Sequence, residues 1–348
     1  MRVAIVGLGL IGVERAKSIL ALAQLEPHIE LVGVYDTNEK SIEKFRNEYP
    51  GVSVAGKMED LILEAPNWVF VATPHDVAYE ISVLLLSRKI GVVLEKPMGR
   101  NLSEAGKLAS LAEKNRVKLR VGLNYRHYRG VENLIQDVRE KKFGSIISVK
   151  MTLGHGNSPG MEKSWKLDKE RCGGGCLIDP GIHLLDLVDV ISGGAVEVHS
   201  VQSWMGFWKT GIEEEAHILL SSQNSTLFNI DISLNRWRSR FCIEVNGTDG
   251  YGVVEGRGGS YGRQTYRTGK RWGWLEGKNQ RESELTRIDY DASDSFFRET
   301  AAILGEDLIG SPINTIYESE AVAHEEALRA MSLLDRCVKK MEIRGVSM

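Results

Sequence analysis

Short apolar runs alternate with longer segments of helical spacing over the first 124 residues. The runs are almost continuously apolar, which is typical of strands buried on both faces of a parallel sheet. Strands separated by helices of this length predict repeated βαβ units, and hence a doubly wound Rossmann sheet of the α/β class. The expected strands are Val3–Val6, Glu30–Tyr35, Trp68–Ala72, Val92–Leu94 and Lys118–Val121, and the expected helices are Ile11–Ala23, Glu39–Tyr49, Val77–Arg88 and Ser103–Lys114.

After Asn124 the pattern changes to longer strands in which polar and apolar residues alternate. Helical segments are expected at Val131–Lys142, Leu177–Ile191 and Glu318–Lys340. The turn signal NGTDG at Asn246–Gly250 favours a hairpin, so an α+β domain with a largely antiparallel sheet is predicted. Its expected strands are Ile146–Leu153, Val196–Phe207, Ala216–Ser221, Thr226–Leu234 and Phe241–Val245.

The length of 348 residues exceeds what a single hydrophobic core usually serves, so two domains are expected. The change of pattern assigns residues 1–124 to the first and residues 125–348 to the second. The segment Gly256–Gly277, rich in glycine, arginine and aromatic residues, is interpreted as a long surface loop, with a substrate lid as the alternative.

Charge and composition exclude several classes of partner. The formal net charge is −3 and the charges of both signs are interspersed, so neither nucleic acid nor a membrane is an expected partner. The apolar runs are shorter than a membrane span and no signal-peptide pattern opens the chain, which favours a cytoplasmic protein. Cys172 and Cys176 flank three glycines, but no nearby Cys or His completes a ligand set, so no metal site is predicted.

A glycine-rich turn follows the first expected strand. Gly7, Gly9 and Gly12 stand between an apolar strand and a helix, the context in which G-x-G-x-x-G binds a dinucleotide. Gly7 permits the tight turn, Gly9 lets the backbone approach the pyrophosphate, and Gly12 lets helix and strand pack closely. The first helical residues, Leu10 and Ile11, would present free N–H groups to the phosphates. A purely structural turn is the alternative.

Asp36 ends the second expected strand, about two dozen residues after Gly12. A carboxylate there accepts hydrogen bonds from the adenosine ribose diol and repels a 2′-phosphate, and no arginine follows at Thr37 or Asn38. NAD is therefore favoured over NADP. The alternative is that Asp36 merely caps the helix that starts near Asn38.

Two later strands also end in polar residues, at the sheet edge where ligands bind in such folds. One strand is followed by Thr73, Pro74 and His75, and the other by Glu95 and Lys96. Neighbouring residues of a strand point to opposite sides, so only one of the last two is expected to face a ligand. We expect Lys96 to do so, because its ammonium could stabilise negative charge on a substrate oxygen. Ordinary solvated charges are the alternative.

Asp179 and His183 are four residues apart in the segment GGGCLIDPGIH, so on a helix they would share one face. Pro180 fits only if that helix begins just before it, and otherwise implies a kink. A histidine beside a carboxylate is a sensible general base, because the acid can orient the ring. A structural, hydrogen-bonded histidine is the alternative.

Taken together, these motifs resemble the glucose–fructose oxidoreductase and inositol dehydrogenase family (Gfo/Idh/MocA). The resemblance runs in order along essentially the whole chain, and the EKP and D-x-x-x-H patterns are more specific than the glycine turn. The sequence departs from the family pattern at Pro180, where a bulkier, helix-compatible residue is common. The matching motifs are GLGLIG at Gly7–Gly12, EKP at Glu95–Pro97, GLNYR at Gly122–Arg126 and GGG-x-x-x-D-x-G-x-H at Gly173–His183.

The resemblance implies a site for NAD and for a sugar, polyol or nucleotide-linked sugar. Lys96, Asp179 and His183 match the catalytic residues of the family, and Asn124 matches a residue near the nicotinamide. The resemblance also implies an open, mostly antiparallel second sheet, one face of which commonly forms homodimer or homotetramer contacts. The residues expected along the cofactor include Thr73, Pro74, His75 and Glu95, and those expected to bind substrate include Tyr125, Arg126 and Trp165.

The expected reaction moves a hydride between nicotinamide and a secondary alcohol or ketone. His183 would exchange the hydroxyl proton, Lys96 would hold the same oxygen, and Asp179 would orient His183 or bind a neighbouring hydroxyl. Two other classes stay open. One is an NAD-dependent glycoside hydrolase that oxidises its substrate transiently; the other is a non-catalytic sensor of the dinucleotide.

Overall fold

The computed structural model describes residues 1–272, 284–291, 293–308 and 320–345. The chain divides into two compact units, one formed by Met1–Asn124 with Ser295–Met331 and the other by Tyr125–Asp294 with Ser332–Met348. The sequence-based division after Asn124 coincides with the first boundary. Residues 295–331, which the sequence pattern assigns to the second domain, pack with the first unit instead.

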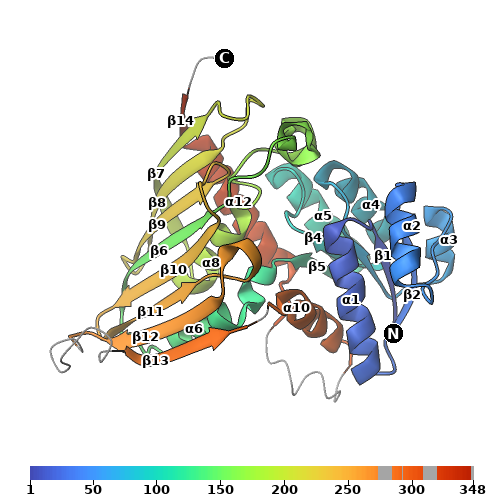
Figure 1. The fold of residues 1–348 in the computed structure, drawn as a ribbon, viewed down its shortest axis with the longest axis horizontal. Helices are drawn as coiled ribbons and strands as arrows, with labels where there is room; N and C mark the ends of the chain where they lie inside the picture. The colour runs from blue at the N-terminus through green and yellow to red at the C-terminus, as the bar shows by residue number, and fades with distance from the viewer. Residues whose placement is uncertain (273–283, 292, 309–319, 346–348) are drawn as a thin grey trace. The chain divides into compact units, whose positions relative to one another are not determined.

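The first unit contains a five-stranded parallel sheet in the order β2-β1-β3-β4-β5 (Figure 1). This confirms the predicted doubly wound sheet. The strand order reverses between β1 and β3, the point at which ligands bind in such sheets. The strands are β1 (Arg2–Val6), β2 (Glu30–Tyr35), β3 (Trp68–Val71), β4 (Gly91–Glu95) and β5 (Leu119–Gly122).

Helices pack against this sheet along its length. Helix α1 lies on β1 and β2, and α4 lies on β3 and β4. Helix α10, which the sequence analysis did not predict, packs against α1 although it lies far along the chain. The helices are α1 (Leu10–Leu25), α2 (Glu39–Glu48), α3 (Met58–Leu63), α4 (His75–Ser87), α5 (Leu102–Asn115), α10 (Ser295–Gly305) and the first half of α12 (His324–Lys339).

The second unit is built on a nine-stranded sheet in the order β13-β12-β11-β10-β6-β9-β8-β7-β14. All pairings are antiparallel except β6 with β9 and β7 with β14, so the predicted mostly antiparallel sheet is confirmed. The strands are β6 (Ile146–Gly154), β7 (Val196–Met205), β8 (Glu215–Ser222), β9 (Leu227–Ser233), β10 (Arg240–Gly247), β11 (Gly250–Glu255), β12 (Gln264–Lys270), β13 (Glu284–Tyr290) and β14 (Met341–Gly345).

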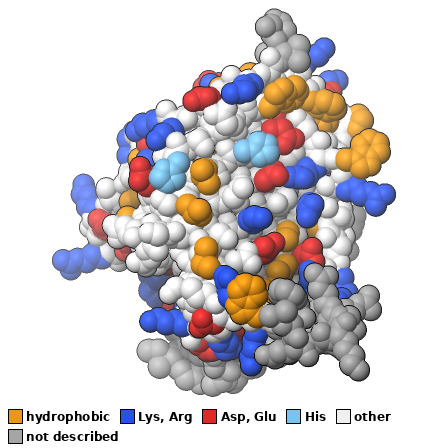
Figure 2. Space-filling model, turned by 90° about the vertical axis from the view of Figure 1, so that its left-hand side faces the viewer, with side chains coloured by type: hydrophobic (Ala, Val, Ile, Leu, Met, Phe, Trp, Pro, Cys, Tyr) orange, Lys and Arg blue, Asp and Glu red, His pale blue; other side chains and the backbone are white. Residues whose placement is uncertain are grey.

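One face of this sheet is apolar and carries helices α6 (Arg129–Arg139) and α8 (Ile182–Ser192) (Figure 1). Along β8, for example, Ala216, Ile218 and Leu220 are buried while the residues between them are more exposed. Figure 2 shows charged side chains and two histidines among hydrophobic groups, several of which lie together at the upper right of the view. The alternation read from the sequence therefore corresponds to one core face and one polar face.

The loop interpretation of residues 256–277 is wrong for its middle part, because Gln264–Lys270 forms β12 and pairs in register with β11. Its threonine and arginine residues hid the strand pattern. Residues 273–277 lie outside the described part of the chain. The predicted last helix is shorter at its start: α12 begins at His324, and residues 318 and 319 of the prediction lie outside the described residues.

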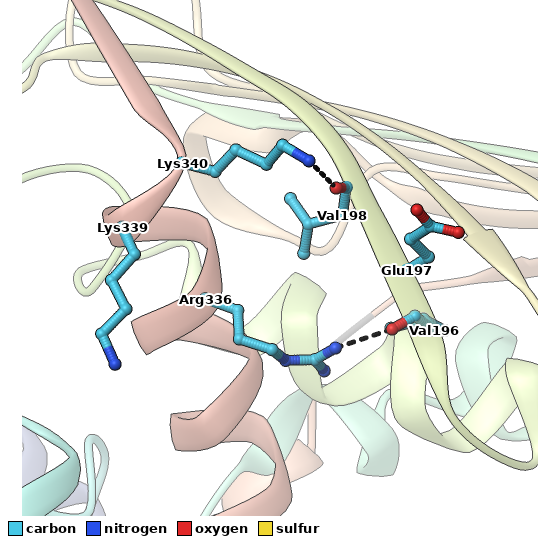
Figure 3. A pocket seen from close by; sticks show the side chains of 6 residues that line it. All are labelled: Val196, Glu197, Val198, Arg336, Lys339 and Lys340. Atoms are coloured by element: carbon cyan, nitrogen blue, oxygen red, sulfur yellow. Dashed lines mark hydrogen bonds between the residues drawn. The ribbon is translucent and has the colours of Figure 1, made fainter.

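The exposed edge of β7 is closed by the end of α12 (Figure 3). Arg336 donates to the carbonyl oxygen of Val196 at 2.7 Å, and Lys340 donates to that of Val198 at 2.8 Å. These carbonyls precede the part of β7 that pairs with β14. Arg336 and Lys340 also line an open groove of about 530 Å³ at this edge. Their role there is to satisfy carbonyl groups of β7 that lie outside its pairing with β14.

No helix in the described residues is both long and apolar enough to cross a membrane.

Candidate functional site

The glycine turn between β1 and α1 has the shape that a bound pyrophosphate requires. Gly7 has a φ of +96°, and a Cβ there would lie 2.5 Å from the carbonyl oxygen of Ala72. A Cβ on Gly12 would lie 1.8 Å from the carbonyl oxygen of Gly7, whereas a Cβ on Gly9 would meet nothing within 4 Å. Gly7 and Gly12 are therefore required by the close packing of turn, strand and helix. Gly9 leaves the outer side of the turn open.

Helix α1 begins at Leu10 with Gly9 as its N-cap, without a side-chain cap and without an acidic residue in its first turn. Leu10 is exposed and Ile11 is half-buried. An uncapped helix start offers backbone N–H groups and the positive end of the helix dipole to an anion. The turn and the helix start together fit the phosphates of a dinucleotide.

Asp36 follows β2 and ties that strand to the glycine turn. Its carboxylate accepts a hydrogen bond from the Leu8 N–H at 2.5 Å and another from the Asn38 N–H at 2.7 Å. The alternative that Asp36 caps the next helix is wrong, because the N-cap of α2 is Asn38, whose side chain accepts from the Ser41 N–H. Asp36 thus lies beside the glycine turn, where a ribose diol would bind.

Thr73, Pro74 and His75 form the exit of β3 and the start of α4. Pro74 is the N-cap of α4, and His75 is buried in its first turn. The hydroxyl of Thr73 is buried and has no hydrogen-bond partner among the described residues, and its methyl group lies beside Gly7. An unsatisfied buried hydroxyl next to the glycine turn fits a polar ligand at this sheet edge.

The side chain of Glu95 is turned into the first unit, where it binds Arg15 of α1. The Arg15 Nε lies 2.6 Å from a Glu95 oxygen, and the same guanidinium binds Glu299 and, at 3.1 Å, the hydroxyl of Thr300 on α10. Arg15 is completely buried. Burial lowers the pKa of Arg15, but its two carboxylate partners outweigh burial and raise it above the ordinary value. Sequence reasoning missed Arg15, although a lone arginine among the apolar positions of α1 was a signal.

Lys96, the residue after Glu95, is half-buried at the carboxyl end of β4. Lys96 itself lies just beyond the strand, which ends at Glu95. Asn124, at the carboxyl end of the neighbouring β5, is buried and donates to the hydroxyl of Ser295 at 3.0 Å. Both residues thus follow adjacent strands at the edge that also carries the glycine turn.

In the second unit a buried glutamate shapes the GGG segment. Glu213 accepts hydrogen bonds from the N–H groups of Gly175 at 2.9 Å and Leu177 at 3.2 Å. A Cβ on Gly175 would lie 2.0 Å from the Glu213 carbonyl oxygen, so the turn requires glycine at this position. Burial raises the pKa of Glu213, and the N–H groups partly oppose that shift. Sequence reasoning missed Glu213, which is 38 residues away from the turn it holds.

Asp179 and His183 do not share a helix face, so that prediction is wrong. Helix α8 begins at Ile182 with Gly181 as its N-cap, and Pro180 separates Asp179 from it. The Asp179 carboxylate lies 3.1 Å from the ammonium of Lys166, and this ion pair raises the lysine pKa. His183 lies in the first turn of α8 and is 4% exposed.

The imidazole of His183 is stacked on the ring of Tyr125. The two ring centroids are 3.8 Å apart and the ring planes differ by 10°. Tyr125 is buried, and burial raises its pKa, so its hydroxyl keeps its proton at neutral pH. The charge of Asp179 adds to that upward shift of the Tyr125 pKa.

The next residue of the GLNYR motif has a structural partner. Arg126 binds Asp186 of α8 through two nitrogens, at 2.6 and 2.8 Å. Because this pair fastens the segment before α6 to α8, it positions Tyr125 against His183. Trp165 lies in a short 3-10 turn next to Lys166, whose ammonium is 5.8 Å from the indole centroid. Substrate binding by Arg126 and Trp165 stays a prediction.

Comparison with known families follows the same division of the chain. Residues 1–123 match the model of the GFO/IDH/MocA oxidoreductase family with an NAD-binding Rossmann fold, and residues 131–252 match that family's C-terminal domain. The chain belongs to the GFO/IDH/MocA family. Its glycine turn is therefore the dinucleotide-binding turn of an NAD-binding Rossmann domain.

Curated relatives of this GFO/IDH/MocA chain include two bacterial sugar and polyol dehydrogenases. The glucose-6-phosphate 3-dehydrogenase of Bacillus subtilis is 32% identical over 189 residues, 54% of this chain and 52% of that protein. The myo-inositol 2-dehydrogenase of Thermotoga maritima is 28% identical over 199 residues, 57% of this chain and 56% of that protein. The chain thus spans about half the length of these relatives.

Solved structures share the fold of this GFO/IDH/MocA chain over its whole length. KijD10, a 3-ketoreductase from Actinomadura kijaniata crystallised with NADP and TDP-benzene, has a TM-score of 0.79 at 15% identity, with 100% and 99% of the two chains covered. GenD2 from gentamicin A biosynthesis, in complex with NAD, has a TM-score of 0.74 at 18% identity, with 98% and 93% covered.

Cys172 and Cys176 are buried and form no disulfide among the described residues, and burial raises the pKa of Cys176. Within the described residues, the group with metal-ligand spacing is Glu215, His217 and Asp231, in which neither cysteine takes part.

Proposed function

We propose that this protein is an NAD(H)-dependent oxidoreductase that moves a hydride between nicotinamide and a secondary alcohol or ketone of a sugar, polyol or nucleotide sugar. The observation that carries the proposal is the stacked Tyr125–His183 pair, in a chain whose other unit holds the NAD-binding turn. The sugar and polyol dehydrogenases among the relatives support the substrate class.

The dinucleotide would be held by the glycine turn and the start of α1, with Asp36 on the adenosine ribose and Thr73 at the neighbouring strand exit. When bound, its nicotinamide supplies the hydride acceptor or donor. Asp36 gives a reason for preferring NAD, because its carboxylate would repel a 2′-phosphate.

His183 acts as the general base in this proposal. Its ring takes the proton of the substrate hydroxyl during oxidation and returns it during reduction. Stacking on Tyr125 fixes the plane of the imidazole, so the nitrogen that receives the proton is held in one direction. Lys96 donates a hydrogen bond to the same substrate oxygen and stabilises negative charge on it. Asp179, paired with Lys166, accepts a hydrogen bond from a neighbouring hydroxyl.

A screen of glucose, glucose 6-phosphate, myo-inositol and UDP-glucose with NAD and NADP tests the function. We expect the absorbance of reduced cofactor to rise with at least one of them, and faster with NAD. A glycoside hydrolase would instead release sugar from a nitrophenyl glycoside without net NADH. A sensor would bind NADH, measured by calorimetry, and turn over nothing. Either of those results would replace the dehydrogenase proposal.

The substitution Asp36→Asn is expected to shift the cofactor preference toward NADP. The amide can still accept from the Leu8 N–H, but the charge that repels a 2′-phosphate is gone. We expect the ratio of kcat/KM for NAD over NADP to fall about tenfold or more, as removal of one like-charge contact implies. The control is Glu39→Gln, which removes a charge from the first turn of α2 nearby in sequence. Equal ratios in both variants would contradict the role of Asp36.

A homodimer or homotetramer is also part of the proposal, as the family resemblance implies. Light scattering coupled to size-exclusion chromatography measures it, and a mass of one chain at assay concentration would contradict it.

A further inference from the structure

The guanidinium of Arg257 lies one aromatic ring, that of Tyr125, away from His183. Arg257 follows β11 in a glycine-rich segment and is half-buried. Its guanidinium carbon lies 3.8 Å from the ring centroid of Tyr261 and 5.2 Å from that of Tyr125. Its Nη1 lies 3.0 Å from the hydroxyl oxygen of Tyr128. The polar and ring contacts of Arg257 among the described residues are thus all with tyrosines.

Arg257 forms no ion pair among the described residues. Asp291 and Asp294 line the same small pocket, but they pair with Arg263 and Arg129. Other arginines of comparable or greater burial bind carboxylates: Arg15 binds two, Arg126 binds Asp186, and Arg267 binds Glu255. The Nε of Arg257 is buried and has no hydrogen-bond partner in the part of the chain that the structure describes. A partly desolvated cation is costly without an anion, and tyrosine rings attract it without neutralising it.

Arg257 therefore brings a positive charge close to His183. Lys166 and Asp179 cancel each other as an ion pair, and Tyr125 is protonated. Arg257 adds one positive charge on the ring of Tyr125, which itself stacks on His183. The distance from the guanidinium to the imidazole is at most the sum of those two ring distances.

We propose that the substrate carries an anionic group, a phosphate or a carboxylate, and that Arg257 binds it while His183 acts on a hydroxyl of the same molecule. This inference rests on the proposed function and narrows its substrate class. The guanidinium is preorganised, because Tyr261 and Tyr128 fix its plane before the substrate arrives. Its planar donors suit the oxygens of phosphate and carboxylate equally, so those two groups are the arms of the test.

The kinetic test compares glucose, glucose 6-phosphate and glucuronate with NAD as cofactor. We expect the wild-type protein to prefer one anionic sugar over glucose by about 100-fold in kcat/KM, as expected for a charged, partly desolvated contact. Arg257→Met should abolish that preference, mainly by raising KM for the anionic sugar, so that kcat/KM falls far more for the anionic sugar than for glucose. Arg257→Lys should keep part of it, because the charge stays and the planar fork is lost.

Arg263→Met is the matched control, since Arg263 lies on the same segment but is exposed and pairs with Asp291. It should keep the preference for the anionic sugar. An equal loss of rate with glucose and with the anionic sugars in Arg257→Met would mean that Arg257 only holds its segment in place, and would overturn the proposal. No preference for either anion in the wild-type protein would overturn it as well.

Calorimetric titration of the full-length protein with glucose 6-phosphate, glucuronate and glucose provides a readout without hydride transfer. Binding of an anionic sugar that weakens with added salt and is lost in Arg257→Met supports the inference even if no sugar reduces NAD, in which case only the proposed function fails. Turnover of neutral sugars with no binding preference for anions would instead overturn the inference and leave the proposed function intact. Circular dichroism of each variant establishes that it is folded.

Discussion

Asparagine in place of His183 is expected to lower kcat by about a thousandfold, within the range that a positioned general base supplies. An amide is planar and polar like the imidazole, but it cannot take up a proton from a hydroxyl near neutral pH. Initial rates with the best substrate of the screen measure the effect. The affinity for NADH, measured by calorimetry, should be unchanged, because the dinucleotide turn belongs to the first unit.

His127→Asn is the matched control for the loss of a buried imidazole. His127 is also fully buried in the second unit, but it is not part of the proposed site. We expect little change in kcat for this variant. A His183→Asn variant with wild-type kcat would rule out the proposed base.

Lys96→Ala should lower kcat by roughly 100-fold or more and keep NADH binding, since it removes the donor to the developing oxyanion.

The first unit could be predicted almost strand by strand because its strands are buried on both faces. Each is a nearly continuous apolar run, so composition alone marks it; β3, for example, is buried at all four positions from Trp68 to Val71. Helix α10 escaped prediction for the opposite reason. Its buried face includes Glu299 and Thr300, which both bind Arg15, and Arg15 lies 284 residues before Glu299.

The second unit was harder because its strands carry many polar residues. β12 reads QTYRTGK, and only its pairing with β11 and β13 shows that it is a strand. The helical spacing of Asp179 and His183 misled for a local reason: a proline follows Asp179, so the helix starts after it. Spacing arguments hold only when every intervening residue can be helical.

Some residues of the proposed site could be predicted from their sequence neighbours, and others could not. The glycine turn, Asp36, Lys96 and His183 stand next to strand or helix ends, so local pattern and motif predict them. Glu213 and Arg257 act through contacts with segments distant in sequence, such as the 129 residues between Tyr128 and Arg257. Neither forms a pattern with its own neighbours. The structure therefore adds the residues that orient the site and set its charge.

Methionine in place of Arg15 is expected to destabilise the protein by about 3–5 kcal/mol, the usual cost of leaving a buried partner charge uncompensated. Arg15 and Glu299 are both completely buried, and Glu95 is only 14% exposed. Removing the guanidinium takes away the cation that both carboxylates bind. The midpoint of thermal unfolding should fall by roughly 10 °C, at about 2–4 °C per kcal/mol for a unit of this size.

Lys17→Met on the same helix separates this effect from the loss of any cation on α1. Lys17 pairs with Glu14 at 3.0 Å, but its side chain is 48% exposed, so the pair contributes at most about 1 kcal/mol. Adding Glu299→Gln to Arg15→Met should restore part of the stability, because one buried charge disappears with the cation. Equal unfolding midpoints for Arg15→Met and Lys17→Met would show that the buried triad of Arg15, Glu95 and Glu299 does not join α10 to the sheet. Because Glu95 precedes Lys96, the same triad positions the proposed oxyanion donor, so kcat should fall in Arg15→Met even at temperatures where the variant is fully folded.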